Sequence, residues 1–208
     1  MLEVDALTKR FGPLLALDDV GFTVEPGQIV GFLGPNGAGK TTTMRAIMGL
    51  VAIDAGTVTW NGTPVHAPIR QRFGYMPAER GMYQRMKIRD HLTYYARLSG
   101  HRGDAAGRAA DGWMERLGLA DRSGDTVQSL SSGNQQRVQI ALALINDPVL
   151  MALDEPFSGL DPVAVDETVV ESESSSSDAQ PTNSRTANPA TRPKRMMIMF
   201  PPRPELGR

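Results

Sequence analysis

A glycine-rich loop is the part of the chain with the clearest chemical potential. Residues 34–41 read GPNGAGKT, which matches the pattern G-x-x-x-x-G-K-[ST] in full. Glycines permit backbone conformations with positive φ, so successive N–H groups can curl around phosphate oxygens. Lys40 adds a mobile positive charge for the β- and γ-phosphates, and the Thr41 hydroxyl can ligate Mg²⁺. The pattern predicts a nucleotide site formed by Gly34, Pro35, Asn36, Gly37, Ala38, Gly39, Lys40, Thr41 and Thr42.

The segments on either side of this loop support that prediction. Gln28–Leu33 is a short apolar run typical of a buried strand, and Thr41–Leu50 is predicted to be a helix. A helix that begins at the loop points its positive dipole end at the same anion. The alternative is a chance glycine-rich turn, and that reading does not account for both flanks.

Two adjacent carboxylates follow a second apolar strand, predicted at Val149–Leu153. In open α/β sheets, ligands bind at the carboxyl edge of the strands, which is where Asp154 and Glu155 would lie. Asp154 can hold Mg²⁺, and Glu155 can polarise a water for attack on the γ-phosphate. Alone, this segment could equally be a strand that ends in solvated acids. Together with the upstream loop it favours a nucleotide site.

The elements that must position these groups alternate between strands and helices. Strands are expected at Leu2–Thr8, Gly21–Val24, Thr57–Trp60 and Arg72–Met76, and helices at Arg89–Ser99, Ala105–Leu119 and Gly133–Ile145. This alternation predicts an α/β domain with a largely parallel sheet.

Composition narrows the possible classes of function. The chain of 208 residues has no cysteine, which excludes disulfides, cysteine-ligated zinc and thiol catalysis. Its formal charge of −1 gives no overall signal for a polyanion partner, so we expect no nucleic acid. No apolar run approaches the roughly 20 residues that a spanning helix needs. We therefore expect the chain not to cross a membrane by itself. The absence of cysteine fits the cytoplasm.

The last part of the chain, residues 172–208, has a different character. It contains a serine run and six of the 15 prolines, and it shows no helical or strand period. We expect this tail to be disordered. Its one apolar cluster, Met196–Phe200, has prolines on both sides, which argues against a core strand.

Taken together, these motifs resemble those of an ABC-type ATPase subunit. Leu130–Arg137 resembles the signature sequence of that family, and Ser158–Asp161 resembles its D-loop. Phe11 falls where the family places an aromatic residue that stacks on adenine. The resemblance covers roughly residues 1–167, with the motifs in family order and spacing. Among such subunits, the chain looks most like bacterial ATPases that serve exporters of ions or drugs.

The resemblance implies a P-loop NTPase fold: a parallel sheet, an antiparallel β portion, a small helical subdomain at about 77–135, and a domain spanning 1–171. It implies binding and hydrolysis of ATP with Mg²⁺, with Thr41 and Asp154 on the metal and Glu155 as the catalytic residue. A second cassette would complete each site with its Ser131, Ser132, Gly133, Asn134 and Asp161. Integral membrane permease subunits would hold the protein at the inner face of the plasma membrane.

Three departures from the family pattern bear on activity. Ala78 stands where the family has a glutamine, and alanine can neither ligate Mg²⁺ nor hydrogen-bond to water, although Glu79 follows it. Ser132 and Asn134 are mild changes in the signature. The three histidines, His66, His91 and His101, all precede Asp161, so none can fill the family's γ-phosphate histidine position beyond the D-loop.

The tail begins where the family pattern fades, and we therefore hypothesise that the chain is truncated, with its last ~40 residues replaced. A natural regulatory tail is the alternative. Three functions stay open: a transporter ATPase, a catalytically impaired nucleotide-binding remnant, and a soluble ABC-type ATPase that acts on ribosomes or DNA. The 91 residues from Lys40 to Ser131 leave room for one small helical subdomain and no coiled coil, which disfavours the third. A kinase or GTPase would not explain Leu130–Arg137.

Overall fold

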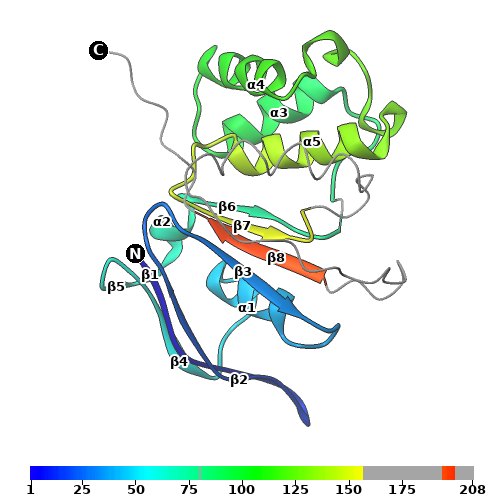
Figure 1. The fold of residues 1–208 in the computed structure, drawn as a ribbon. Coiled ribbons are helices and arrows are strands. Elements are labelled where there is room, and N and C mark those ends of the chain that lie inside the picture. The colour runs from blue at the N-terminus through cyan, green and yellow to red at the C-terminus, as the bar shows by residue number, and fades with distance from the viewer. Residues whose placement is uncertain (80, 157–193, 200–208) are drawn as a thin grey trace, which may run out of the picture.

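The computed structural model describes residues 1–79, 81–156 and 194–199, and it contains two β-sheets and a group of helices. Figure 1 shows the antiparallel sheet at one end of the molecule, the second sheet in the middle and a group of helices at the other end. Helix α1 (Lys40–Ile47) lies between the two sheets and contacts strands of both. Most of the predicted elements are present within one to three residues of their expected bounds, except that β2 begins seven residues earlier.

The first sheet is the antiparallel portion that the family resemblance implies. Its strand order is β2 (Leu14–Val24), β1 (Leu2–Phe11), β4 (Ala55–Trp60) and β5 (Thr63–Pro64). Buried apolar side chains such as Leu2, Val4 and Leu7 in β1 face the main core. The hairpin of β1 and β2 brings Phe11 opposite Leu14. The packed antiparallel sheet therefore fixes the position of Phe11 and Leu14 at the turn between β1 and β2.

The second sheet carries the segments with chemical potential. Its order is β3 (Ile29–Gly34), β8 (Lys194–Met199), β7 (Leu150–Asp154) and β6 (Phe73–Met76). Strands β6 and β7 pair in parallel, whereas β8 is antiparallel to both β3 and β7. Strands β3, β6 and β7 thus run in one direction, as predicted, and the carboxyl ends of β3 and β7 meet at one edge.

Strand β8 corrects the sequence-based expectation for part of the tail. We expected disorder over residues 172–208 and no core strand at Met196–Phe200, and both expectations are wrong for Lys194–Met199. In sequence, Pro193 and Pro201 fall outside the strand, so neither removes one of its ladder hydrogen bonds. The backbone of β8 pairs with β3 on one side and β7 on the other, so neither edge is left unpaired in the slot between them. The Ile198 side chain of β8 is completely buried in the core. The rest of residues 172–208 lies outside the described residues.

The helices at the other end form a second apolar cluster. Helices α3 (Ile88–Leu98), α4 (Ala105–Arg116) and α5 (Ser132–Leu144) pack on one another, with short 3₁₀ turns at Ala120–Arg122 and Val127–Ser129. Helix α5 also packs on β6, which joins this cluster to the second sheet. The cluster extends from Met82 to Ile145. The short helix α2 (Ala67–Arg70) and strand β5 were not expected from the sequence.

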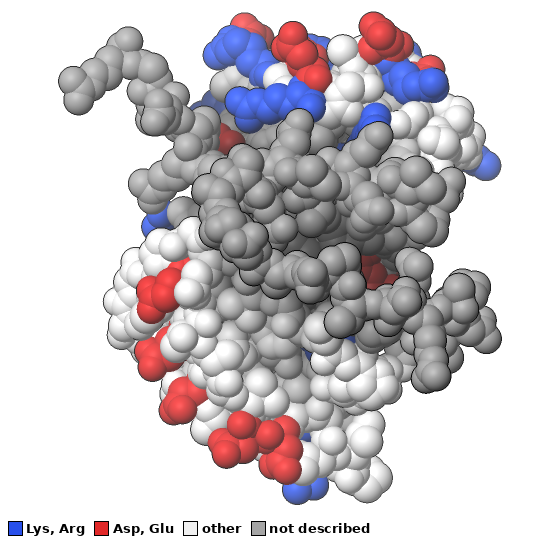
Figure 2. Space-filling model, viewed as in Figure 1, with Lys and Arg blue, Asp and Glu red and all other residues white. Residues whose placement is uncertain are grey.

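Charge is distributed differently over the two ends. On the face in Figure 2, acidic side chains lie over the antiparallel sheet, where Asp5, Asp18 and Asp19 are exposed. At the helical end both signs of charge occur, and Arg89 pairs with Asp111 at 2.6 Å. Within the described part of the chain, no helix has the length and apolar character needed to span a membrane.

Candidate nucleotide site

The glycine-rich loop connects the end of β3 to the start of α1. Gly37 and Gly39 have φ of 86° and 80°, in the left-handed region that favours glycine. A Cβ atom at Gly39 would lie 2.6 Å from the Ala16 carbonyl oxygen, so the loop passes too close to β2 for any side chain there. The loop conformation therefore depends on glycine at this position for two separate reasons.

The start of α1 is suited to an anion. Its N-cap residue is Gly39, no side chain caps the helix, and its first turn contains no acidic residue. The first N–H groups of a helix have no acceptor within the helix, and they carry the positive end of its dipole. A phosphate at this place would receive these hydrogen bonds.

Lys40 lies folded back over the same loop. Its Nζ donates hydrogen bonds to the carbonyl oxygens of Gly34 at 2.8 Å and Pro35 at 2.7 Å. These carbonyls hold the ammonium group beside the start of the helix, where phosphate oxygens would replace them as stronger, charged acceptors. The loop therefore holds the Lys40 ammonium group where it could bind a polyphosphate.

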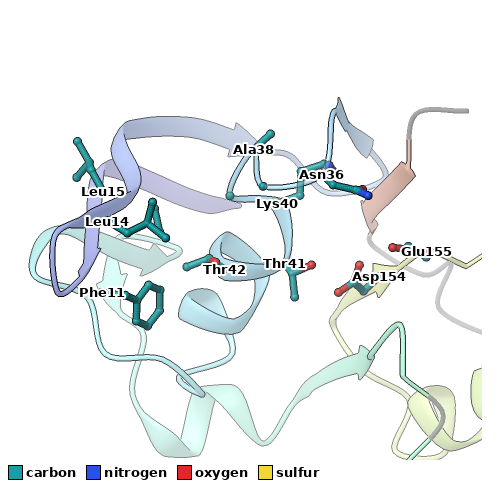
Figure 3. A pocket seen from close by; sticks show the side chains of 13 residues that line it. Phe11, Leu14, Leu15, Asn36, Ala38, Lys40, Thr41, Thr42, Asp154 and Glu155 are labelled. Atoms are coloured by element: carbon teal, nitrogen blue, oxygen red, sulfur yellow. The ribbon is translucent and has the colours of Figure 1, made fainter. Parts of the chain in front are cut away.

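Asp154 and Glu155 lie across the pocket from the loop. Asp154 ends β7 and is only 1% exposed, and Glu155 follows it with φ of 55°. Figure 3 shows both carboxylates on the side of the pocket opposite Phe11, with Thr41 between. Burial raises the pKa of the nearby Tyr75 hydroxyl above its usual value of 10.0; Arg45 opposes this rise and the negative charge of Asp154 adds to it. Tyr75 therefore stays neutral beside the carboxylate.

The loop, the carboxylates and an apolar wall enclose one cavity of about 420 Å³. The wall consists of Phe11 from β1 and Leu14, Leu15 and Ala16 from β2, and Phe11 is 48% exposed. An accessible aromatic face at one end and phosphate-binding groups at the other suit a molecule with a flat base and a polyphosphate. Phe11 could be predicted from the sequence, whereas the three β2 residues could not, because only the register of the β1–β2 pairing brings them to the pocket.

The residues that line this cavity fit Mg·ATP. The Thr41 hydroxyl and the buried Asp154 carboxylate supply the oxygen ligands that Mg²⁺ prefers, beside the loop that would hold the phosphates. Seven loop and helix residues expected to contact the nucleotide line the cavity together with both carboxylates: Asn36, Gly37, Ala38, Gly39, Lys40, Thr41 and Thr42. Gly34 and Pro35 contribute through their carbonyls to Lys40.

The signature-like segment lies at the start of α5, apart from this pocket. Ser131 is the N-cap of α5, and its Oγ accepts a hydrogen bond from the Asn134 N–H at 3.4 Å. Ser132 is exposed and Gly133 is half-buried. These four residues do not line the described pocket of their own chain, and neither does Ala78. The predicted D-loop residue Asp161 lies outside the described residues.

A family model and similar curated proteins agree on one family for this chain. The family described as ABC transporter matches residues 17–158. The chain is 46% identical over 166 residues to the uncharacterized ABC transporter ATP-binding protein YhaQ of Bacillus subtilis, covering 80% of this chain and 56% of that protein. It is 38% identical over 168 residues to the lipopolysaccharide export system ATP-binding protein LptB of Escherichia coli, covering 76% of this chain and 68% of LptB.

A solved structure described as the ATP-binding subunit of an ABC transporter has the same fold. It superposes with a TM-score of 0.64 at 30% identity, covering 79% of this chain and 70% of that one. The chain spans little more than half the length of YhaQ.

Proposed function

This chain belongs to the ABC transporter family of ATP-binding proteins, and from that premise we propose that it binds and hydrolyses Mg·ATP in the pocket between the glycine-rich loop and Asp154–Glu155. The observation that carries the proposal is that the loop, both carboxylates and an aromatic wall line one cavity. The domain would span residues 1–171, with a helical subdomain at about 77–135.

Each group in the pocket has a role that its chemistry suits. The α1 N–H groups and Lys40 bind the phosphates, and Phe11 stacks on the base. Thr41 and Asp154 hold Mg²⁺, which neutralises charge that develops on the phosphate oxygens. Glu155 orients a water and accepts its proton during attack on the γ-phosphate. Catalysis of this kind depends on positioning and charge rather than on covalent chemistry.

We propose that two copies bind head to tail around the nucleotide. The supporting observation is that Ser131, Ser132, Gly133 and Asn134 lie outside the pocket of their own chain. A second copy could place this helix start, with the Ser131 hydroxyl, against the γ-phosphate. ATP would then hold the dimer closed, and hydrolysis would release it.

Integral membrane permease subunits would turn this closure into transport and choose the substrate. The protein would work in the cytoplasm, at the inner face of the plasma membrane, and its association with the membrane would come only through that partner. We expect no nucleic-acid partner, because the described residues at the helical end carry charges of both signs on the face in Figure 2.

A second candidate function is nucleotide binding without turnover. Ala78, which stands at the position of the expected loop glutamine, favours it because a methyl group can neither contact Mg²⁺ nor orient a water. The same pocket would then bind Mg·ATP, and closure of the dimer would not be reset by hydrolysis.

Replacing Glu155 by glutamine separates the two candidates. For an ATPase, phosphate release falls by about two to four orders of magnitude, as expected for loss of a general base, and an ATP-bound dimer accumulates in light scattering. For a binding protein, the wild type already accumulates the dimer and the variant does not differ from it. A wild type that releases phosphate and is unchanged by the substitution would contradict the role given to Glu155.

A further inference from the structure

Two buried glutamines lie on one face of α5. Gln136 is 4% exposed and Gln139 is 5% exposed, and their spacing of three residues places them on the same side of the helix. A buried side-chain amide is favourable only when its polar atoms find partners. Both glutamines find them outside their own helix, on backbone carbonyl oxygens of other segments.

Gln136 reaches the turn that carries Glu155. Its Nε2 donates a hydrogen bond to the carbonyl oxygen of Pro156 at 2.7 Å, and this contact is buried. Pro156 directly follows Glu155, whose φ of 55° lies in a region that non-glycine residues rarely adopt. Such a conformation persists only when the surrounding structure holds it. The Gln136 amide is a fixed, buried donor on the residue next to Glu155.

Gln139 makes the same kind of bond to a different place. Its Nε2 donates to the carbonyl oxygen of Pro77 at 2.6 Å, just after β6 ends at Met76. Pro77 does not line the nucleotide pocket. Gln139 Nε2 also lies 3.5 Å from the Glu79 carbonyl oxygen. The two side chains are therefore alike in type, in residue burial and in the length of their shorter bond, and they differ in the segment that they hold.

We propose that Gln136 is a positioning residue for Glu155: its amide fixes the turn in which the catalytic carboxylate faces the γ-phosphate. This inference rests on the proposed ATPase function. Because Gln136 belongs to the helix whose first turn is the signature-like segment, the same bond connects that segment to the carboxylate of its own chain. A displacement of α5 would be transmitted to Glu155 through one rigid contact.

Gln136 itself does not line the pocket, and its bond holds neither the glycine-rich loop nor the start of α1. Loss of the amide should therefore affect the reacting geometry and leave the affinity for Mg·ATP intact. A displacement of about 1 Å at a reacting group can cost about 100-fold in rate. We accordingly expect a loss that appears in kcat and not in KM.

The test compares Gln136→Met with Gln139→Met in the full chain. Both replacements keep an unbranched side chain of similar size, and each removes a short amide–carbonyl hydrogen bond of 2.6–2.7 Å, so both should lower the thermal midpoint. We expect Gln136→Met to lower kcat by about 10- to 100-fold with the Kd for Mg·ATP unchanged, and Gln139→Met to keep kcat within about threefold. Equal losses of kcat in the two variants would overturn the proposal, because they would indicate a general structural effect.

A double variant distinguishes a positioning role of Gln136 from a general structural role. In the Glu155→Gln background, Gln136→Met should have no further effect on the residual single-turnover rate, because the carboxylate that it positions is already absent. Additive losses overturn the proposal. If the wild type releases no phosphate above the Glu155→Gln background, the proposed function fails and this inference with it. If the wild type is active and Gln136→Met matches it, only the inference fails.

Discussion

Replacing Gly39 by alanine should destabilise the glycine-rich loop for two reasons: the positive φ of this residue and its close approach to β2. Its φ of 80° makes any L side chain unfavourable there, which costs about 1–2 kcal/mol. The added Cβ would also lie 2.6 Å from the Ala16 carbonyl oxygen and 2.7 Å from Leu17 Cδ2. Overpacking of this kind costs about 1–3 kcal/mol more. The expected loss in the free energy of unfolding is therefore about 2–5 kcal/mol.

Gly37→Ala is the matched control for this substitution. Gly37 has a similar φ of 86°, and nothing lies within 4 Å of a Cβ atom built there. Only the conformational cost of about 1–2 kcal/mol applies. Urea denaturation followed by circular dichroism measures both losses, and a titration with Mg·ATP measures the effect on binding. Equal losses in the two variants would refute the reasoning, because the contact with β2 would then contribute nothing.

Two further predictions concern the core. Ile198→Ala should lower the free energy of unfolding by about 2–5 kcal/mol in urea denaturation, because Ile198 in β8 is completely buried. Leu33→Ala on β3 is the control, and it should change this free energy by less than about 0.5 kcal/mol because Leu33 is 69% exposed. Equal effects would mean that β8 does not fill the sheet. Burial lowers the pKa of His91 in the folded chain below its usual value of 6.5. Just below pH 6.5 the unfolded chain therefore binds more protons than the folded chain does. The contribution of His91 to stability should be complete above pH 6.5 and should fall as the pH drops toward the lower folded pKa. Thermal midpoints across this range should show a weaker fall for His91→Leu, and an identical fall would assign the effect to other groups.

Much of this architecture could be predicted because its signals are local. Apolar runs located β3 and β7, and the glycine pattern with Asp154 and Glu155 identified the pocket that the structure shows. Helical periodicity located α3, α4 and α5 within a few residues. In each case neighbouring residues in sequence determine the local structure, and the pairing of elements follows from their order.

The features that were missed depend on contacts between distant segments. β8 forms because a slot between β3 and β7 accepts an apolar segment, and nothing in Met196–Phe200 itself indicates that slot. Leu14, Leu15 and Ala16 enter the pocket through the register of the β1–β2 hairpin. The burial of Gln136 and Gln139 also gives no sequence signal, because glutamine in a helix is usually exposed.

The central claim is that the loop, its lysine and the facing carboxylates form a site for Mg·ATP. Isothermal titration of the full chain with Mg·ATP, beside its Lys40→Ala variant, tests that claim most directly. The account predicts saturable binding by the wild type and an affinity about 10- to 100-fold lower for Lys40→Ala, since a hydrogen bond to a charged group contributes about 1.5–3 kcal/mol. Absence of saturable binding by the wild type, or equal affinities for the two proteins, would contradict it.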